Sequence, residues 1–202
     1  AAVRDETSSK LRFYVDGKLI GKRRDVSLNH KGTLGFCVQN EEWHHFHQFD
    51  GWVDETRISS IARYDEEFTP ARRFELDEHT LALYHFDEGQ GDVLKDSSGN
   101  NHHGQITGAK WVRADDAQHQ PKPEASGTPA APGTFGLNFN DCIGEEQWGV
   151  TAELNVTVDV STIEAWFTPT KSTPTNIRYS RGVLAKLYSR ITAENLCILA
   201  AR

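Results

Sequence analysis

Alternation of apolar and polar residues predicts short β-strands along most of the chain. Residues 154–160 alternate strictly between Leu or Val and polar residues, which is the period-two pattern of a half-buried strand. Asp16-Gly17 separates two apolar runs at 11–15 and 18–20, and this pair favours a β-hairpin because its type I′ turn needs positive φ. Similar runs predict further strands over residues 32–38, 52–59, 81–86 and 162–167.

The residues between these runs indicate the fold class. Gly, Asp, Asn and Ser separate the predicted strands, and the stretch with the best helical spacing, 62–74, is interrupted by Pro70. We therefore expect an all-β chain that folds as an antiparallel, two-sheet jelly-roll sandwich. Residues 114–133 hold four of the seven prolines, mixed with Ala, Gly and Ser, which predicts a linker or long loop.

Charge and composition narrow the classes of function. Asp and Glu number 29 against 22 Lys and Arg, a net charge of −7, which argues against a nucleic-acid partner because such partners need a basic surface. No apolar run approaches the roughly 18 residues that a membrane span needs, so we expect no membrane segment in this chain. No leader peptide is visible, and the chain lacks methionine, so we expect it to be a piece of a longer protein.

The most oxygen-rich stretch of the chain predicts a calcium site. Four carboxylates and two asparagine amides fall within fifteen residues, at Asp87, Glu88, Asp92, Asp96, Asn100 and Asn101. Ca²⁺ takes six to eight oxygen ligands, and we expect Asp96, Asn100 and, from across the loop, Asp87 to supply them. The spacing does not match an EF-hand. The alternative is an Asx-turn, in which the Asp96 side chain caps its own backbone.

Two further groups of residues suggest a carbohydrate ligand. Trp43 and Trp52 flank an acidic, His-rich stretch, and exposed aromatic rings of this kind stack on sugars; the alternative is packing in the core or at its rim. Glycoside hydrolysis needs paired carboxylates, which lie along one strand as E-x-D-x-x-E in jelly-roll glucanases. The nearest match places Glu75 and Asp77 correctly but has Thr80 at the last position, so we expect no catalysis.

Several motifs together resemble laminin G-like (LamG) domains. Residues 11–19 (L-R-F-Y-V-D-G-K-L) and 51–59 (G-W-V-D-E-T-R-I-S) resemble a hairpin and a late strand of the C-terminal half of such a domain. Other motifs resemble its N-terminal half, and they lie at residues 81–89, 96–104 (D-S-S-G-N-N-H-H-G), 136–141, 162–169 (T-I-E-A-W-F-T-P) and 182–186. The resemblance implies the concanavalin A-like fold, two antiparallel sheets packed face to face.

The order of the motifs implies how the chain is divided. The late motifs come first, so residues 1–78 resemble the C-terminal half of one LamG-like domain. Residues 79–202 resemble the N-terminal part of a second domain, which contains the linker at 114–133. On this interpretation the sandwich is incomplete at the chain ends. The alternative is that both halves complete a single sandwich by permuted pairing.

The family also implies a function. LamG-like modules bind glycans or extracellular proteins, in some members with Ca²⁺, and are common in large bacterial multidomain proteins. We therefore expect a non-catalytic binding module of an extracellular or cell-surface protein. Two alternatives stay open at this point: a glycoside hydrolase of the same fold, and a structural spacer that binds nothing. A shared fold does not decide between them.

Overall fold

The structure is a computed structural model that describes residues 1–5, 7–24, 32–39, 51–113, 135–138, 148–154, 161–169 and 195–198. Within these ranges the chain forms thirteen β-strands and no helix, which confirms the prediction of an all-β chain. Among the same residues there is no helix long and apolar enough to cross a membrane.

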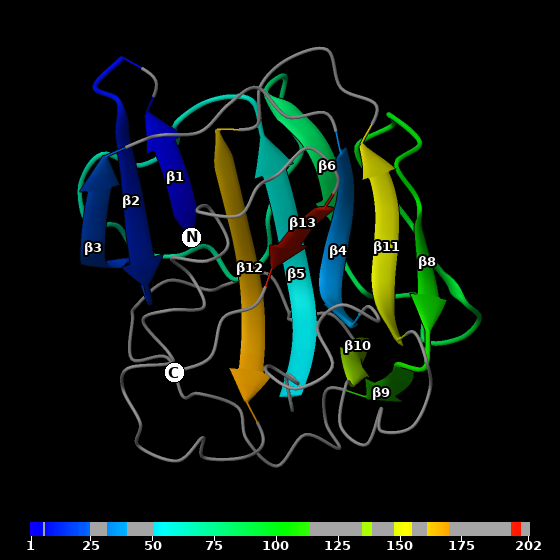
Figure 1. The fold of residues 1–202 in the computed structure, drawn as a ribbon. Coiled ribbons are helices and arrows are strands. Elements are labelled where there is room, and N and C mark those ends of the chain that lie inside the picture. The colour runs from blue at the N-terminus through cyan, green and yellow to red at the C-terminus, as the bar shows by residue number, and fades with distance from the viewer. Residues whose placement is uncertain are drawn as a thin grey trace.

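Eight strands form the larger sheet. They are β1 (Ala2–Asp5), β2 (Lys10–Val15), β3 (Lys18–Arg24), β5 (Gly51–Ser59), β6 (Thr80–Tyr84), β9 (Lys110–Arg113), β10 (Phe135–Asn138) and β12 (Thr162–Pro169). Their order is β3-β2-β1-β12-β5-β10-β9, and β6 also pairs with β5 (Figure 1). Every pairing in this sheet is antiparallel.

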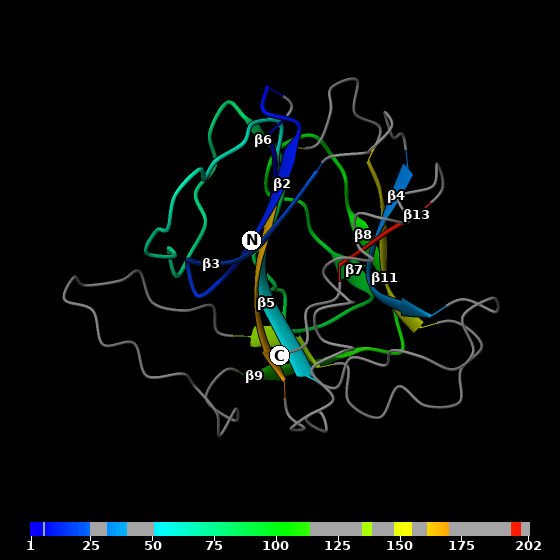
Figure 2. The same cartoon turned by 60° about the vertical axis from the view of Figure 1, so that its left-hand side comes forward.

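Five strands form the smaller sheet. They are β4 (Gly32–Gln39), β7 (Val93–Leu94), β8 (Gly104–Thr107), β11 (Trp148–Leu154) and β13 (Asn195–Ile198), in the order β13-β4-β11-β8-β7. These pairings are antiparallel except for β13, which runs parallel to β4. Figure 2 shows the two sheets as two layers.

Most predicted strands are present among the described residues. The hairpin of β2 and β3 turns at Asp16 and Gly17, which have φ values of 50° and 74°, so both residues have the positive φ that the Asp-Gly pair predicted. Of the strand predicted over residues 154–160, only Leu154 is described, and it is the last residue of β11. Residues 155–160, and the predicted strand at 182–186, lie outside the described residues, so both stay predictions.

Each of the two sheets contains strands that precede residue 78 in the sequence and strands that follow it. β12 lies between β1 and β5, where Ile163 is in register with Ala2 on one side and Ile58 on the other. In the smaller sheet, β11 pairs with β4 on one side and with β8 on the other. The division into two domain fragments at residue 78 stays a prediction, and these pairings supply a way to test it.

Apolar side chains fill the space between the layers. Ile58 and Ile163 are buried in register at the centre of the larger sheet, and Leu137 is buried on β10. In the smaller sheet, burial alternates along β8: Gly104 and Ile106 are buried, and Gln105 and Thr107 are exposed. Each such aliphatic side chain stabilises the fold by ~1.5–3 kcal/mol relative to leaving it exposed.

Residues 60–79, which we call the strap, connect β5 to β6 without regular secondary structure. They cross the face of the larger sheet that points away from the smaller sheet (Figure 2). The rings of Tyr64 and Phe68 stack with centroids 3.5 Å apart, and Tyr14 of β2 meets Phe68 edge-on at 5.4 Å. The Phe68 amide donates to the Gly17 carbonyl, and a Cβ at Gly17 would lie 1.7 Å from the Phe68 oxygen. The strap therefore covers a face that strand alternation alone would leave in water.

Candidate functional site at the bulge of β5

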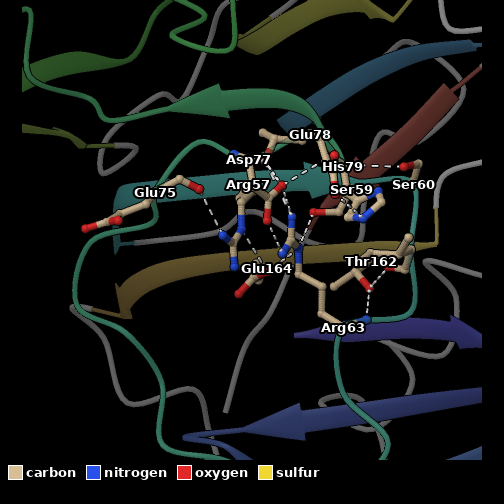
Figure 3. Close-up of polar contacts among 12 residues, drawn as sticks. Arg57, Ser59, Ser60, Arg63, Glu75, Asp77, Glu78, His79, Thr162 and Glu164 are labelled. Carbon is tan, nitrogen blue, oxygen red and sulfur yellow. Dashed lines mark hydrogen bonds and ion pairs between the residues drawn. The ribbon is translucent and has the colours of Figure 1, made fainter.

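A buried polar network fastens the strap to the sheet. Glu164 of β12 is only 3% exposed, and its Oε2 accepts hydrogen bonds from Arg57 Nε at 3.1 Å and Nη2 at 2.9 Å. Its Oε1 accepts from the Tyr64 hydroxyl at 2.8 Å, and burial, with the Glu164 charge, raises the pKa of Tyr64. Figure 3 shows the side chains of Arg57, Arg63 and Glu164 meeting between β5, β12 and the strap. The described partners of Glu164 belong to β5 and to the strap, so we assign this network to stability.

Glu75 and Asp77, the two carboxylates that partly match the glucanase motif, belong to the same structural region. Arg63 donates from both terminal nitrogens to Asp77, each at 2.7 Å, and these bonds hold the pKa of Asp77 well below its usual range. Asp77 also accepts from the Thr80 hydroxyl and the His79 amide, so it closes the turn before β6. Glu75 is exposed, and its backbone carbonyl accepts from Arg57. The arrangement gives Asp77 a role in holding the strap.

Asp96 lies at the expected turn, and its carboxylate is fully occupied by donors. It is 4% exposed. Oδ1 accepts from the amides of Leu83 at 3.0 Å and Ser98 at 2.9 Å, while Oδ2 accepts from the Ser98 hydroxyl at 2.8 Å and the His102 amide at 3.0 Å. These contacts are those of an Asx-turn that also ties the turn to β6. Donor hydrogens surround the carboxylate, so a cation there would have to displace them.

The other expected calcium ligands have separate partners. Asn100 donates its amide nitrogen to the carbonyls of Leu81 and Thr80. Asp87 forms an ion pair with Arg73 at 2.9 Å. Among the described residues, no group of three or more His, Cys, Asp or Glu side chains is arranged to hold a metal ion. Calcium binding at this turn stays a prediction for experiment.

Replacement of Asp96 by alanine is expected to lower the free energy of unfolding by ~2–4 kcal/mol in EDTA, because it leaves buried amides without an acceptor. Urea unfolding measures this, with the exposed Asp92→Ala as the matched control. Thermal unfolding in millimolar Ca²⁺ and in EDTA tests the calcium prediction: a bound ion raises the melting temperature of the wild type but not of Asp96→Ala. If the wild-type melting curves in Ca²⁺ and in EDTA coincide, Asp96 only caps the backbone of its own turn and binds no calcium.

A second cluster lies where β5 changes partners. On one edge β5 pairs with β6 over Thr56 to Ser59 and with β10 over Trp52 and Val53, so Asp54 and Glu55 face the gap between them. On the other edge the register with β12 shifts, and these two residues lie opposite the single residue Trp166. Such a β-bulge changes the direction of side chains, which lets two consecutive residues share one side of a sheet.

The bulge holds Glu55 among donors. The side chain is 1% exposed. Oε1 accepts from Arg73 at 3.3 Å, Oε2 accepts from the Phe74 amide at 3.1 Å, and His85 Nδ1 lies within 3.1 Å of both oxygens. Because Arg73 also pairs with Asp87, one guanidinium joins the strap to β5 and to the chain that follows β6.

Asp54, beside Glu55, has a different environment. It is half-buried, and its Oδ1 is enclosed with no hydrogen-bond partner. Burial raises the pKa of Asp54 to about 7; the negative charges of Glu55 and Asp87 act in the same direction, and Arg73 and Arg72 oppose them. Neighbouring carboxyl groups whose environments differ in this way are common in acid–base catalytic sites and in structures that change with pH.

A row of side chains crosses the end of the larger sheet beside this bulge. Trp52 of β5 is in register with Asn138 of β10, which is in register with Lys110 of β9. Residues directly paired across strands share a face, so we call these three the Trp52 row. Trp52 and Asn138 are half-buried, Lys110 is exposed, and Trp52 Nε1 is enclosed without a hydrogen-bond partner. Trp43, the other expected ligand residue, lies outside the described residues.

Sequence reasoning selected Trp52 as a ligand residue but did not select Asn138, Lys110, Asp54 or Glu55. A signal for the last two was present, because Asp and Glu are depleted in strands, and two consecutive acids stand inside an otherwise regular strand motif. No pattern in the sequence indicates that β9 and β10 bring Lys110 and Asn138 beside Trp52.

Comparison with protein-family models, with curated proteins and with solved structures finds no match to this chain.

Proposed function

We propose that this chain is a non-catalytic, LamG-like module that binds a glycan or an extracellular protein on behalf of a larger extracellular protein. The proposal rests on the motifs at residues 11–19, 51–59 and 96–104 and is supported by the arrangement of two β-sheets. A jelly-roll topology of the concanavalin A-like kind is part of the proposal. Calcium is a proposed assisting ion, to be tested at Asp96 as described above.

The observation that carries a glycan ligand is the Trp52 row. An indole ring, a carboxamide and an ammonium group side by side offer a stacking surface and hydrogen-bonding groups, which is the composition that sugar rings require. Asn138 and Lys110 lie on the β10–β9 edge, beyond which the larger sheet has no further described strand.

A glycan array followed by titration calorimetry tests this proposal. We expect a Trp52→Ala variant to bind the selected glycan at least tenfold more weakly, a loss of ~1.4 kcal/mol, and Lys110→Ala to weaken it less. The exposed Lys95→Ala is the matched control and should bind as the wild type does. A folded protein that binds nothing on the array, and no matrix protein in a pull-down, would favour the structural spacer instead.

One observation favours a second candidate, a glycoside hydrolase. Asp54 and Glu55 supply an acid that holds its proton near pH 7 and a carboxylate held by Arg73, the two components of such a reaction. Release of reducing ends from β-glucans and galactans would support it if Asp54→Asn and Glu55→Gln abolished turnover and Glu75→Gln did not. An unchanged rate in both bulge variants would exclude catalysis at this pair.

A further inference from the structure

The stretch of β5 around the bulge leaves an unusual share of its polar atoms unsatisfied. Among the described residues, the buried side-chain atoms without a hydrogen-bond partner are Arg12 Nη1, Trp52 Nε1, Asp54 Oδ1, Thr56 Oγ1 and Glu88 Oε2. Three of them lie between Trp52 and Thr56. A buried unpaired acceptor is costly when it belongs to a carboxylate and much less costly when the group is a neutral acid.

The surroundings of Asp54 also concentrate negative charge. Glu55 lies next to it on β5, and Asp87 approaches from the chain that follows β6. The strap contributes Arg72 and Arg73, but Arg73 is already shared between Glu55 and Asp87. His85 faces Glu55, β12 presents Trp166 and β10 presents Asn138 next to Trp52. Three carboxyl groups thus compete for two guanidinium groups, which favours keeping one carboxyl protonated.

We propose that the bulge of β5 is a pH-sensitive joint: Asp54 is a neutral acid while β5 is closed against strap residues 71–74, and loss of its proton loosens that contact. The geometry allows this because the contact depends on few bonds. Glu55 holds the Phe74 amide and Arg73, and an added charge on Asp54 would compete with Glu55 for the Arg73 guanidinium. On the edge of β5 that faces β6 and β10, no described strand pairs with Asp54 or Glu55.

The direction of the pH dependence follows from linkage. The folded chain holds the Asp54 proton up to a pKa of about 7, whereas an unfolded aspartate releases it near its ordinary value of 3.8. Between those values the folded state binds more protons than the unfolded state, so stability contributed by this group falls as pH rises from ~4 to ~7 and then levels off. This is opposite to the effect of a salt-bridged aspartate such as Asp77, whose contribution is lost on acidification.

Thermal unfolding of the chain between pH 4 and 8 tests the joint, with wild type, the isosteric Asp54→Asn and the exposed control Asp92→Asn. We expect the wild-type melting temperature to fall by roughly 5–10 °C relative to Asp54→Asn between pH 5 and 7.5, and Asp92→Asn to follow the wild type. Hydrogen exchange should show the protection factor of the Phe74 amide falling about tenfold from pH 5.5 to 8 in the wild type only.

A carboxyl-carbon NMR titration of the wild type gives a readout that does not depend on a variant folding. The Asp54 resonance should titrate near pH 7, and Glu55→Gln should lower that midpoint because a negative neighbour is removed. An Asp54 midpoint below pH 5, or melting curves of wild type and Asp54→Asn that stay parallel across the range, would overturn the proposal. Protection of the Phe74 amide that does not change with pH would equally exclude a joint at this place.

Discussion

Replacement of Glu164 by alanine is expected to lower the free energy of unfolding by ~3–5 kcal/mol, because it leaves buried positive charge without its partner. The side chain accepts two bonds from Arg57 and one from Tyr64, and Arg63 Nε lies 3.7 Å away. Arg57 also covers the Phe74 ring at 5.0 Å, so its displacement would disturb the strap beyond the ion pair. Urea unfolding followed by tryptophan fluorescence measures the loss.

The control for this prediction is Glu66→Ala, which removes the same carboxylate from an exposed position of the strap. We expect that variant to remain within about 0.5 kcal/mol of the wild type. Tyr64→Phe deletes one bond and should cost ~1 kcal/mol, and its effect should shrink in the Glu164→Ala background, since the two groups share an interaction. A Glu164→Ala variant as stable as Glu66→Ala would show that the network contributes nothing net.

Fragments made by cutting the chain between residues 113 and 134 are expected to fold only together. Fragment 1–113 lacks β12, and both β1 and β5 then lose the strand between them. It also lacks β11, which joins β4 to β8. Circular dichroism melting should show no cooperative transition for either fragment alone, and a transition for their equimolar mixture.

Fragments 1–78 and 79–202 test the division that the motif order predicted. If each corresponds to part of a separate domain, mixing them should change neither melting curve. If they complete one sandwich, the mixture should regain a cooperative transition that neither fragment has alone. A cooperative melt of fragment 1–78 as a strict monomer would contradict the pairing of β12 with β1 and β5.

Local patterns predicted most of the strands, because strand alternation and turn chemistry are properties of neighbouring residues. Asp16-Gly17 is an example: its positive φ values require no knowledge of the rest of the chain. The strap could not be predicted in this way. Its position depends on the rings of Tyr14, Tyr64 and Phe68 meeting across fifty residues of sequence, and its composition shows no regular period.

The candidate site was harder to predict for the same reason. The alternation at 162–167 places Glu164 on the side opposite the core, where a glutamate is expected in water; the strap buries it instead. The alternative interpretation of Asp96, an Asx-turn, is present, since D-S-S-G-N carries local information, while its role as a calcium ligand stays a prediction. Asp54 acquires its environment from burial, from a register shift against β12 and from Arg73 and Asp87. Two consecutive acids in a strand mark the position as unusual, but they do not indicate which residues surround it.

The position of β12 also affects the order in which this chain can fold during synthesis. Ala2 pairs with Ile163, so the first strand leaves the ribosome about 160 residues before its neighbour. Until then, facing edges of β1 and β5 are unpaired, and β5 carries the apolar Val53 and Ile58. Contacts of such long sequence separation make folding slow, and open edges in the interval invite pairing with other nascent chains. We therefore expect the yield of folded protein to depend on translation speed and on chaperones that cover exposed strands.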